Sequence, residues 1–321
     1  GAAARNGPAG AHRVPVQHHH AHLAACLADT GEERALGVVW DGTGLGPDGT
    51  IWGGEFLRGD ARAYHRVGHL RPFRLPGGDA AVREPRRLAL ALAHAAWGDE
   101  GVEATLRRLG PGVFEDAELN VFRQVLDRGV RAPWTTSVGR LFDGVASLLG
   151  LHQRVEFEGE AAMALEYAVD PAAEGAYPFP VVAATGEGAG PVVPADYPGE
   201  AGVRDSALRD CDGPALVVDW APALAELLGD LDRGVARETV AARFHNGLAA
   251  AIGRVAAEVG EARVALTGGV FQNRVLTERA AAELRGLGLR PLLHRRVPAN
   301  DGGLALGQVA VAAARERDDA G

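Results

Sequence analysis

The sequence predicts an α/β fold, because segments typical of buried strands alternate along the chain with segments that have helical periodicity. Near the beginning, the apolar run 35–40 (ALGVVW) is followed by a glycine-rich turn and by a strand-like run at 50–57 (TIWGGEFL), which indicates a hairpin. Near the end, a strand at 262–266, a glycine turn, a helix at about 272–287 and a strand at 290–294 follow one another.

The central part of the chain supplies most of the other elements. Residues 170–213 are rich in proline, glycine and alanine, and this predicts mostly loop. A loop at 298–303 leads into a last helix at 304–315. The remaining predictions are helices at 80–98, 115–128, 138–151, 158–168, 221–228 and 233–259, and a strand at 215–220.

Composition excludes several classes of protein. The 321 residues are 47% hydrophobic and 23% charged, as in ordinary globular proteins. A net charge of −9 argues against binding to nucleic acid, which requires a basic face. The two cysteines, Cys26 and Cys211, cannot form a disulfide scaffold or a cysteine-rich zinc module. Because no apolar run approaches about 18 residues, we expect a cytoplasmic protein with no membrane partner.

The segment 17–22 (QHHHAH) carries the strongest chemical signal, with four histidines in five positions before an apolar, helix-like stretch. If that stretch is helical from about His18, then His18 and His22 lie one turn apart on the same face. Two neutral imidazoles at this spacing can bind one metal ion side by side. The alternatives are a polar terminal run or a purification-tag remnant, although a tag would be an uninterrupted histidine run.

A second signal is the sequence Asp41-Gly42-Thr43-Gly44, which directly follows the first predicted strand. Glycines at such a place let the backbone approach phosphate oxygens, with amide groups and the Thr43 hydroxyl as donors. The Asp41 carboxylate can hold a metal or orient a water molecule. The same tetrapeptide is also an ordinary hairpin turn.

Two junctions near the end of the chain also combine glycines with polar residues. Gly268 and Gly269, with Asn273 after them, either place a phosphate or flat ligand at a helix N-terminus or form a tight turn. Asp301 precedes the last helix, where it is either an N-cap or a metal ligand that completes a set of two histidines and a carboxylate. Four other charged residues are expected to be solvated surface charges: Arg140, Asp143, Glu158 and Glu160.

In their order along the chain, these motifs resemble one family. Over about residues 14–316 the sequence is similar to the C-terminal, Kae-like carbamoyltransferase domain of the HypF hydrogenase maturation proteins. The resemblance implies an actin/Hsp70-like, two-lobed α/β fold. The segments that carry it are 16–28 (VQHHHAHLAACLA), 41–57 (DGTGLGPDGTIWGGEFL), 75–85 (LPGGDAAVREP), 137–151 (SVGRLFDGVASLLGL), 157–166 (FEGEAAMALE), 242–249 (ARFHNGLA) and 266–276 (LTGGVFQNRVL).

The resemblance also implies an activity. Full-length HypF proteins convert carbamoyl phosphate and ATP to carbamoyl adenylate, and the Kae-like domain passes the carbamoyl group to the C-terminal cysteine of the partner protein HypE. The product is later dehydrated to a cyanide ligand of the nickel–iron hydrogenase. We therefore expect a carbamoyltransferase that uses ATP or carbamoyl adenylate and one divalent metal, with iron, zinc and magnesium as the alternatives.

Site residues follow from the resemblance by position. His18, His22 and Asp301 are implied as the core metal ligands, with Asp41 as an additional ligand, and His18, His22 and Asp41 as catalytic residues. His19 and His20 are expected to orient these ligands. The implied nucleotide-binding residues are Gly42, Thr43 and Gly44 at the phosphate, Gly268, Gly269 and Asn273 at the adenosine, and Gly139 and Asp143 at the ribose or base.

The chain also departs from the family. Its expected parts are a remnant of lobe I with the metal-binding helix (1–33), lobe II with the nucleotide-binding loops (34–299) and a closing helix returning to lobe I (300–321). The start of lobe I is missing from this division, as are the acylphosphatase-like, zinc and YrdC-like modules of full-length HypF. We therefore expect a C-terminal fragment that retains nucleotide or carbamoyl adenylate binding, with partial activity at most.

Two alternative functions stay open on the sequence. One is an O-carbamoyltransferase acting on a small-molecule hydroxyl, which would share the site. The other is a non-catalytic nucleotide-binding module of the Hsp70 kind, although such a module has no need for two histidines and a late aspartate. The sequence indicates neither the metal nor the oligomeric state.

Overall fold

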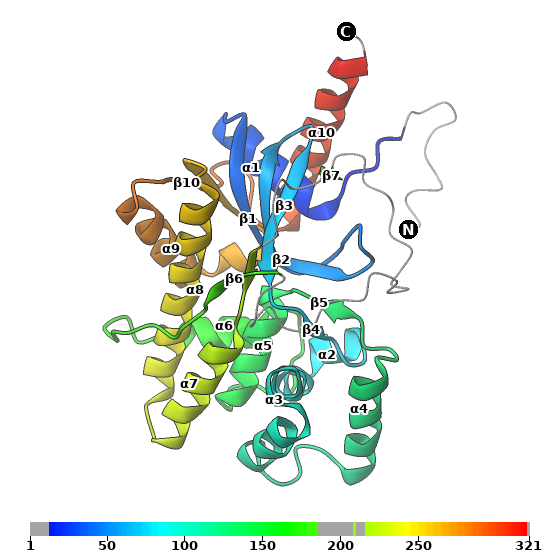
Figure 1. The fold of residues 1–321 in the computed structure, drawn as a ribbon, viewed down its shortest axis with the longest axis vertical. Coiled ribbons are helices and arrows are strands. Elements are labelled where there is room, and N and C mark those ends of the chain that lie inside the picture. Colours follow the sequence, from blue (N-terminus) through cyan, green and yellow to red (C-terminus); the bar gives the residue numbers. More distant parts are fainter. Residues whose placement is uncertain (1–12, 185–207, 210–215, 320–321) are drawn as a thin grey trace.

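A mixed β-sheet runs through the protein and carries helices on both faces (Figure 1). The computed structural model describes residues 13–184, 208–209 and 216–319. The sheet has the strand order β10-β9-β1-β2-β3-β8-β6, and this confirms the predicted α/β class. Its main strands are β1 (Arg34–Leu45), β2 (Ile51–Asp60), β3 (Tyr64–Leu70), β6 (Val181–Ala183), β8 (Leu216–Val218), β9 (Arg263–Thr267) and β10 (Arg290–Leu292), with the short β4 (Phe73–Arg74), β5 (Trp134–Thr135) and β7 (Leu208–Arg209) beside them.

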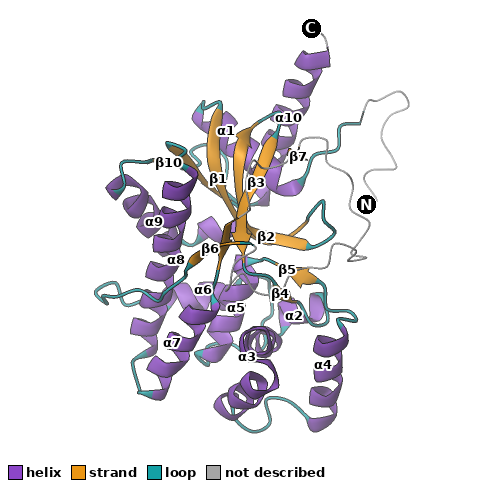
Figure 2. Ribbon diagram, in the orientation of Figure 1, coloured by secondary structure: helices purple, strands orange, loops and turns teal. Residues whose placement is uncertain are grey.

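Helices form the outer layers around the sheet (Figure 2). The first and last helices pack against each other on one face, while α5 and α8 contact β1 from the other. The helices are α1 (His18–Thr30), α2 (Asp79–Arg83), α3 (Pro85–Leu109), α4 (Asp116–Arg128), α5 (Val138–Leu148), α6 (Glu160–Tyr167), α7 (Ala221–Asp232), α8 (Arg237–Val259), α9 (Arg274–Gly286) and α10 (Leu304–Asp319), with 3-10 turns η2 (Gly269–Gln272) and η3 (Asp301–Gly303).

Strand β1 separates two hydrophobic cores because its side chains alternate between the two faces of the sheet. Leu36, Val38 and Trp40 are fully buried in the larger core with α5 and α8. Ala35 and Val39 lie in the smaller core, against α1. The strand is therefore buried on both faces, which explains why it reads in the sequence as a continuous apolar run.

Helix α1 is buried almost all round and is fixed at both ends. The Gln17 side chain caps its N-terminus by accepting a hydrogen bond from the His20 amide. Gly31 ends the helix in the left-handed conformation, with φ of 74°. Asp29 accepts hydrogen bonds from the amides of Arg295 and Arg296, which hold its pKa well below the usual range despite burial. The helix is thereby tied to the loop that leads toward α10.

A glycine allows α10 to cross α1 at very short range. A Cβ atom at Gly307 would lie 1.8 Å from the Ala21 carbonyl oxygen and 3.0 Å from the Ala25 amide nitrogen. Both are backbone atoms, so no side-chain rotation can make room. This crossing places the start of α10, with its preceding η3 turn, beside the histidines of α1. The three-part division into lobe segments stays a prediction.

Several predicted elements differ in the structure. The glycine-rich tetrapeptide 41–44 is not the hairpin tip: β1 continues to Leu45, and the register with β2 shifts between Trp40 and Gly44, as at a β-bulge. The predicted helix 80–98 is divided before Pro85, whose ring cannot continue a helix, and α3 then extends to Leu109. Strand β3 was not predicted, because its histidines and arginine hide the apolar alternation.

Within the segment 170–213, predicted to be mostly loop or a short insertion, the described residues include the short strands β6 and β7. Cys211 and residues 1–12 lie outside the described residues. Cys26 is fully buried, and burial raises the pKa of its thiol to about 12. Such a thiol is inert, which leaves Cys26 a packing residue.

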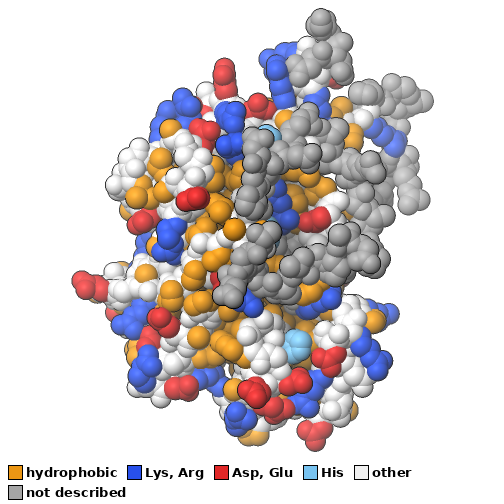
Figure 3. All heavy atoms as spheres, viewed as in Figure 1, with side chains coloured by type: hydrophobic (Ala, Val, Ile, Leu, Met, Phe, Trp, Pro, Cys, Tyr) orange, Lys and Arg blue, Asp and Glu red, His pale blue; other side chains and the backbone are white. Residues whose placement is uncertain are grey.

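The face of the molecule seen in Figure 3 is not basic, and no described helix could cross a membrane. Figure 3 shows arginine and acidic side chains interspersed over the described part of the face in view. Within the described ranges, every helix falls short of the combined length and apolar character that a bilayer crossing demands.

Replacing Gly307 by alanine should lower the free energy of unfolding by about 1–3 kcal/mol, because the added Cβ overpacks a backbone-to-backbone crossing. Urea denaturation would measure the change. Gly286→Ala is the matched control: a Cβ there meets nothing within 4 Å, so its effect should stay within about 1 kcal/mol and be stabilising. Equal effects of the two substitutions would show that the crossing is not tight.

Candidate metal and nucleotide site

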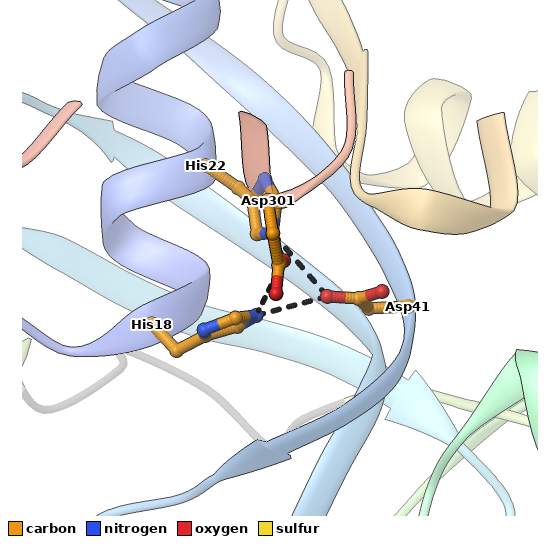
Figure 4. A group of neighbouring side chains, drawn as sticks. All are labelled: His18, His22, Asp41 and Asp301. Carbon is orange, nitrogen blue, oxygen red and sulfur yellow. Dashed lines mark hydrogen bonds and ion pairs between the residues drawn. The ribbon is translucent and has the colours of Figure 1, made fainter. Parts of the chain in front are cut away.

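Four side chains with metal-binding atoms meet where α1, β1 and η3 come together (Figure 4). One donor atom from each of His18, His22, Asp41 and Asp301 lies within 4.8 Å of the other three. The His18 Nε2 and His22 Nε2 atoms are 2.9 Å and 3.2 Å from Asp41 Oδ2. They are 3.6 Å and 3.4 Å from Asp301 Oδ1. The structure thus brings together the four residues that the sequence singled out as ligands.

The backbone explains why the two histidines converge. They occupy positions i and i+4 of α1, so their rings lie one above the other on one face, with centroids 4.8 Å apart. Gly44 permits the strand to approach this face, since a Cβ there would lie 2.9 Å from the His18 ring and 2.5 Å from the His19 ring. Gly44 therefore serves helix-to-strand packing.

Asp41 is held from two sides. Its Oδ1 atom accepts hydrogen bonds from the Gly42 amide at 2.8 Å and the Gly269 amide at 3.2 Å. This is possible because β1 and β9 are parallel neighbours whose carboxyl ends reach the same edge of the sheet. Since Oδ1 is occupied, Oδ2 is the oxygen that faces His18 and His22.

Asp301 is available as a ligand because its neighbour takes over the capping. The Asn300 side chain accepts a hydrogen bond from the Gly302 amide and caps the η3 turn. The alternative role of Asp301 as an N-cap is therefore wrong. Its carboxylate, 71% exposed, instead faces the two imidazoles.

Opposite charges dominate the electrostatics of this cluster. Burial of Asp41 opposes its ionisation, but contact with His18 and His22 outweighs burial and holds its pKa far below the ordinary value. Contact with His22 also lowers the pKa of Asp301. Burial disfavours the charged form of His22, but the two carboxylates prevail and raise its pKa. The carboxylates are thus ionised at neutral pH and ready to bind a cation.

The donor set fits a divalent transition metal. Two imidazole nitrogens and two carboxylate oxygens suit iron or zinc better than a metal ion that prefers oxygen ligands alone. Ligands about 2.1 Å from one ion lie roughly 3.0 Å apart in octahedral and 3.4 Å apart in tetrahedral geometry. The nitrogen–oxygen distances of 2.9–3.6 Å cover this range.

The neighbouring histidines, His19 and His20, lie outside the donor set. His19 is fully buried, with Nδ1 3.2 Å from Gln17 Nε2 and its ring against Trp52. His20 Nε2 lies 2.8 Å from the Asp60 carbonyl oxygen, and its ring packs on Tyr64. These contacts fix the orientation of α1, and the His19 ring also packs edge-to-face against the His18 ring, with centroids 5.1 Å apart.

A cavity of about 350 Å³ opens directly beside the cluster and shares Asp41 and Asp301 with it. Of the predicted nucleotide-binding residues, Gly42, Thr43, Gly139 and Gly269 line it. The other lining residues are Arg140, Glu158, Gly159, Ala162, Val270, Gln272, Asn300 and Gly302.

One wall of this cavity is built from backbone near a helix N-terminus. The Ser137 side chain caps α5 and donates hydrogen bonds to the carbonyl oxygens of Asp41 and Gly42. Gly139 lets the strand cross the first turn of α5, because a Cβ there would lie 2.9 Å from Gly42 Cα. Such a junction of glycine backbone and helix N-terminus favours a bound anion.

The other predicted nucleotide contacts do not line the cavity. Gly44 faces α1, and Gly268, with φ of 99°, presses against the Trp40 carbonyl. Asn273 caps α9 and has its amide nitrogen 2.9 Å from His245 Nε2. Asp143 is 2% exposed and lies against Arg140. Gly44, Gly268, Asn273 and Asp143 thus each make a contact within the fold, while their roles as ligand-binding residues remain predictions.

Arg140, Asp143 and Glu158 were expected on the surface, and this is wrong for Arg140 and Asp143, whose side chains are 3% and 4% exposed. Arg140 and Glu158 line the cavity, as do Gln272 and Asn300. The sequence contained a usable signal, because all four residues are within or adjacent to the quoted motifs. Their orientation, however, depends on how distant segments meet.

Comparison with known proteins identifies the family. The family model described as "Carbamoyltransferase, Kae1-like Domain, second subdomain" matches residues 37–308. The carbamoyltransferase HypF of Rhodobacter capsulatus is 42% identical over 323 residues, which cover 98% of this chain and 37% of that protein. The HypF of Synechocystis sp. is 37% identical over 307 residues, covering 92% of this chain and 36% of that protein.

A solved structure also matches. It is described as full-length HypF in the phosphate- and nucleotide-bound form and superposes with a TM-score of 0.79 at 29% identity, covering 95% of this chain and 36% of that one. The chain therefore spans about a third of the length of these relatives.

Asp301→Asn should weaken metal binding by more than about tenfold, because it removes a charged ligand while the exposed position leaves folding intact. Metal content after anaerobic purification, and titration of the metal-free protein with Zn²⁺, would measure this. Asp232→Asn is the control, because its carboxylate is equally exposed at 71% but pairs with Arg108 and does not belong to the donor cluster. Unchanged metal content in Asp301→Asn would refute the ligand assignment.

Asp143 should make stability pH-dependent. Burial raises its pKa to about 6, with Arg140 opposing and Glu158 adding to the effect. Since the unfolded value is about 3.9, the folded protein keeps a proton that the unfolded chain has lost, so stability falls as pH rises from about 4 through about 6.

Comparison with Asp143→Asn isolates this contribution. The free energy of unfolding of the parent chain, minus that of the variant, should decrease by up to about 3 kcal/mol between about pH 4 and pH 7. Urea denaturation at several pH values would measure it. Parallel pH profiles for the two proteins would show that Asp143 is already ionised at low pH.

Proposed function

The chain belongs to the HypF family of carbamoyltransferases, and we propose that it forms the transfer site of such an enzyme. It would bind carbamoyl adenylate and pass the carbamoyl group to the C-terminal cysteine thiol of HypE. The observation that carries this proposal is that Asp41 and Asp301 belong both to the donor cluster and to the cavity wall. A ligand in the cavity is therefore in direct reach of a metal held by the cluster.

The chain's own groups would position the substrate. The glycine backbone at Gly42 and Gly269 and the N-terminus of α5 favour the phosphate of an adenylate. The exposed Thr43 beside them can donate a further hydrogen bond. A cavity of about 350 Å³ is in the range of small-molecule sites. Because the carbonyl of an adenylate is already activated, the main task of this arrangement in the transfer is to position that carbonyl.

A divalent metal bound by His18, His22, Asp41 and Asp301 would supply Lewis-acid polarisation and charge neutralisation at the phosphate or carbonyl. Asp41 would hold the metal in a fixed position, because the carboxylate oxygen that faces away from the histidines accepts hydrogen bonds from two backbone amides. The metal would be iron or zinc, with magnesium as the alternative that two imidazoles disfavour.

In the transfer step the cysteine thiolate attacks the carbamoyl carbon. The new sulfur–carbon bond forms as the bond between that carbon and the phosphate oxygen breaks, and AMP leaves with the electron pair. The thiol proton is released to solvent before the attack, so no strong base is required. The HypF relatives favour this thiol acceptor over a small-molecule hydroxyl. We place the reaction in the cytoplasm, with carbamoyl phosphate and ATP as the substrates of the complete enzyme.

Trans-complementation would test the proposal. A HypF variant truncated before its own transfer domain would supply carbamoyl adenylate from ATP and carbamoyl phosphate. Addition of this chain and HypE should then increase the mass of the HypE C-terminal peptide by one carbamoyl group, as measured by mass spectrometry. Asp301→Asn should reduce the yield more than about tenfold, and Asp232→Asn should not.

Carbamoylation that does not depend on the chain would contradict the proposal. The chain alone, given ATP and carbamoyl phosphate, should form no carbamoyl adenylate. Detection of that adenylate would show that the chain performs the first half of the reaction as well.

A further inference from the structure

Arg140 is a buried cation at the cavity wall that the proposed reaction has not yet used. It lies on the first turn of α5 with its side chain 3% exposed, and it lines the cavity. Asp143 balances its charge, with 3.2 Å between Nη1 and Oδ2. Its Nε and Nη1 atoms nevertheless lack a hydrogen-bond partner in the described part of the chain. A buried guanidinium with unpaired N–H groups is stabilised when an oxyanion accepts hydrogen bonds from them.

Glu158 supplies such an oxyanion in the structure. Arg140 Nη2 donates a hydrogen bond to Glu158 Oε1 at 3.2 Å. A Cβ atom at Gly42 would lie 2.8 Å from the same Oε1 and 3.2 Å from Nη2, so the ion pair sits directly above Gly42. This is the glycine at which the phosphate of an adenylate is expected.

The two partners of this ion pair differ in freedom. Arg140 is fixed by burial on a helix, whereas the Glu158 side chain is 59% exposed on the segment before α6. Glu158 can therefore turn into solvent at small cost, since half-exposed ion pairs contribute little free energy.

We propose that Arg140 is the phosphate-binding cation of the cavity and that Glu158 occupies the position of the phosphate until a nucleotide displaces it. The inference rests on the proposed function, because it assigns a role at the same site. The ligand class is a nucleoside monophosphate or its acyl derivative, which presents one phosphate group. One oxyanion replaces another at a fixed cation, so the carboxylate lowers affinity without blocking the site.

Calorimetric titration with AMP would test the role of Glu158. Glu158→Gln keeps the size of the side chain and removes the competing charge, so AMP should bind up to about fivefold more tightly. Glu156→Gln makes the same chemical change on an exposed neighbour that does not line the cavity, and AMP affinity there should stay within about twofold. Adenosine has no phosphate, and its affinity should not respond to Glu158→Gln.

The role of Arg140 requires a variant that still folds. Because Arg140→Gln alone would leave Asp143 buried and unpaired, we compare Arg140→Gln with Asp143→Asn in one chain against Asp143→Asn alone. The double variant should bind AMP at least about tenfold more weakly than the single variant and adenosine about equally. Circular dichroism would confirm that both variants are folded.

The outcomes separate this inference from the proposed function. Failure of the parent chain to bind AMP or adenosine would overturn both. AMP binding that is unaffected by Glu158→Gln and by loss of Arg140 would overturn only the assignment of these two residues. Weaker AMP binding in Glu158→Gln would also contradict it, since Glu158 would then be a ligand contact.

Discussion

The hydrogen bonds and ion pairs of one carboxylate, Asp41, connect the parts of the site. One oxygen accepts hydrogen bonds from the amides of Gly42 and Gly269, and the other faces His18 and His22. The pairing of β1 with β9 brings these amides together, and the packing of α1 on β1 brings the histidines. Because the carboxylate is ionised and held on both sides, the donor cluster and the cavity keep a fixed distance from each other.

Glycines set the distances between the elements around this carboxylate. Gly44 lets β1 approach the histidine rings, Gly139 lets it cross α5, and Gly307 lets α10 cross α1. A side chain at any of these positions would separate two elements that must meet for the cluster to close. Several glycines near the site therefore serve close packing of elements. Other glycines, among them Gly42 and Gly269, line the cavity.

The sequence predicted the α/β class and the four candidate ligands, because hydrophobic alternation and the i, i+4 spacing of histidines are local properties. It misplaced the hairpin tip, since the bulge after Trp40 depends on the register between β1 and β2. It missed β3, whose strand character comes from pairing with β2 and β8. Arg140 and Asp143 were assigned to the surface, although packing around α5 buries both.

What the sequence determined by itself was the chemistry available: two imidazoles one helical turn apart, carboxylates after a strand and before a helix, and glycines that leave backbone amides accessible. The tertiary structure decided which of these groups act together. Asp301 reaches histidines that lie nearly the whole chain away only because α10 returns to α1, and Arg140 faces the cavity only because α5 begins beneath β1. Contacts between residues so distant in sequence arise from packing of whole elements, and local pattern does not encode that packing.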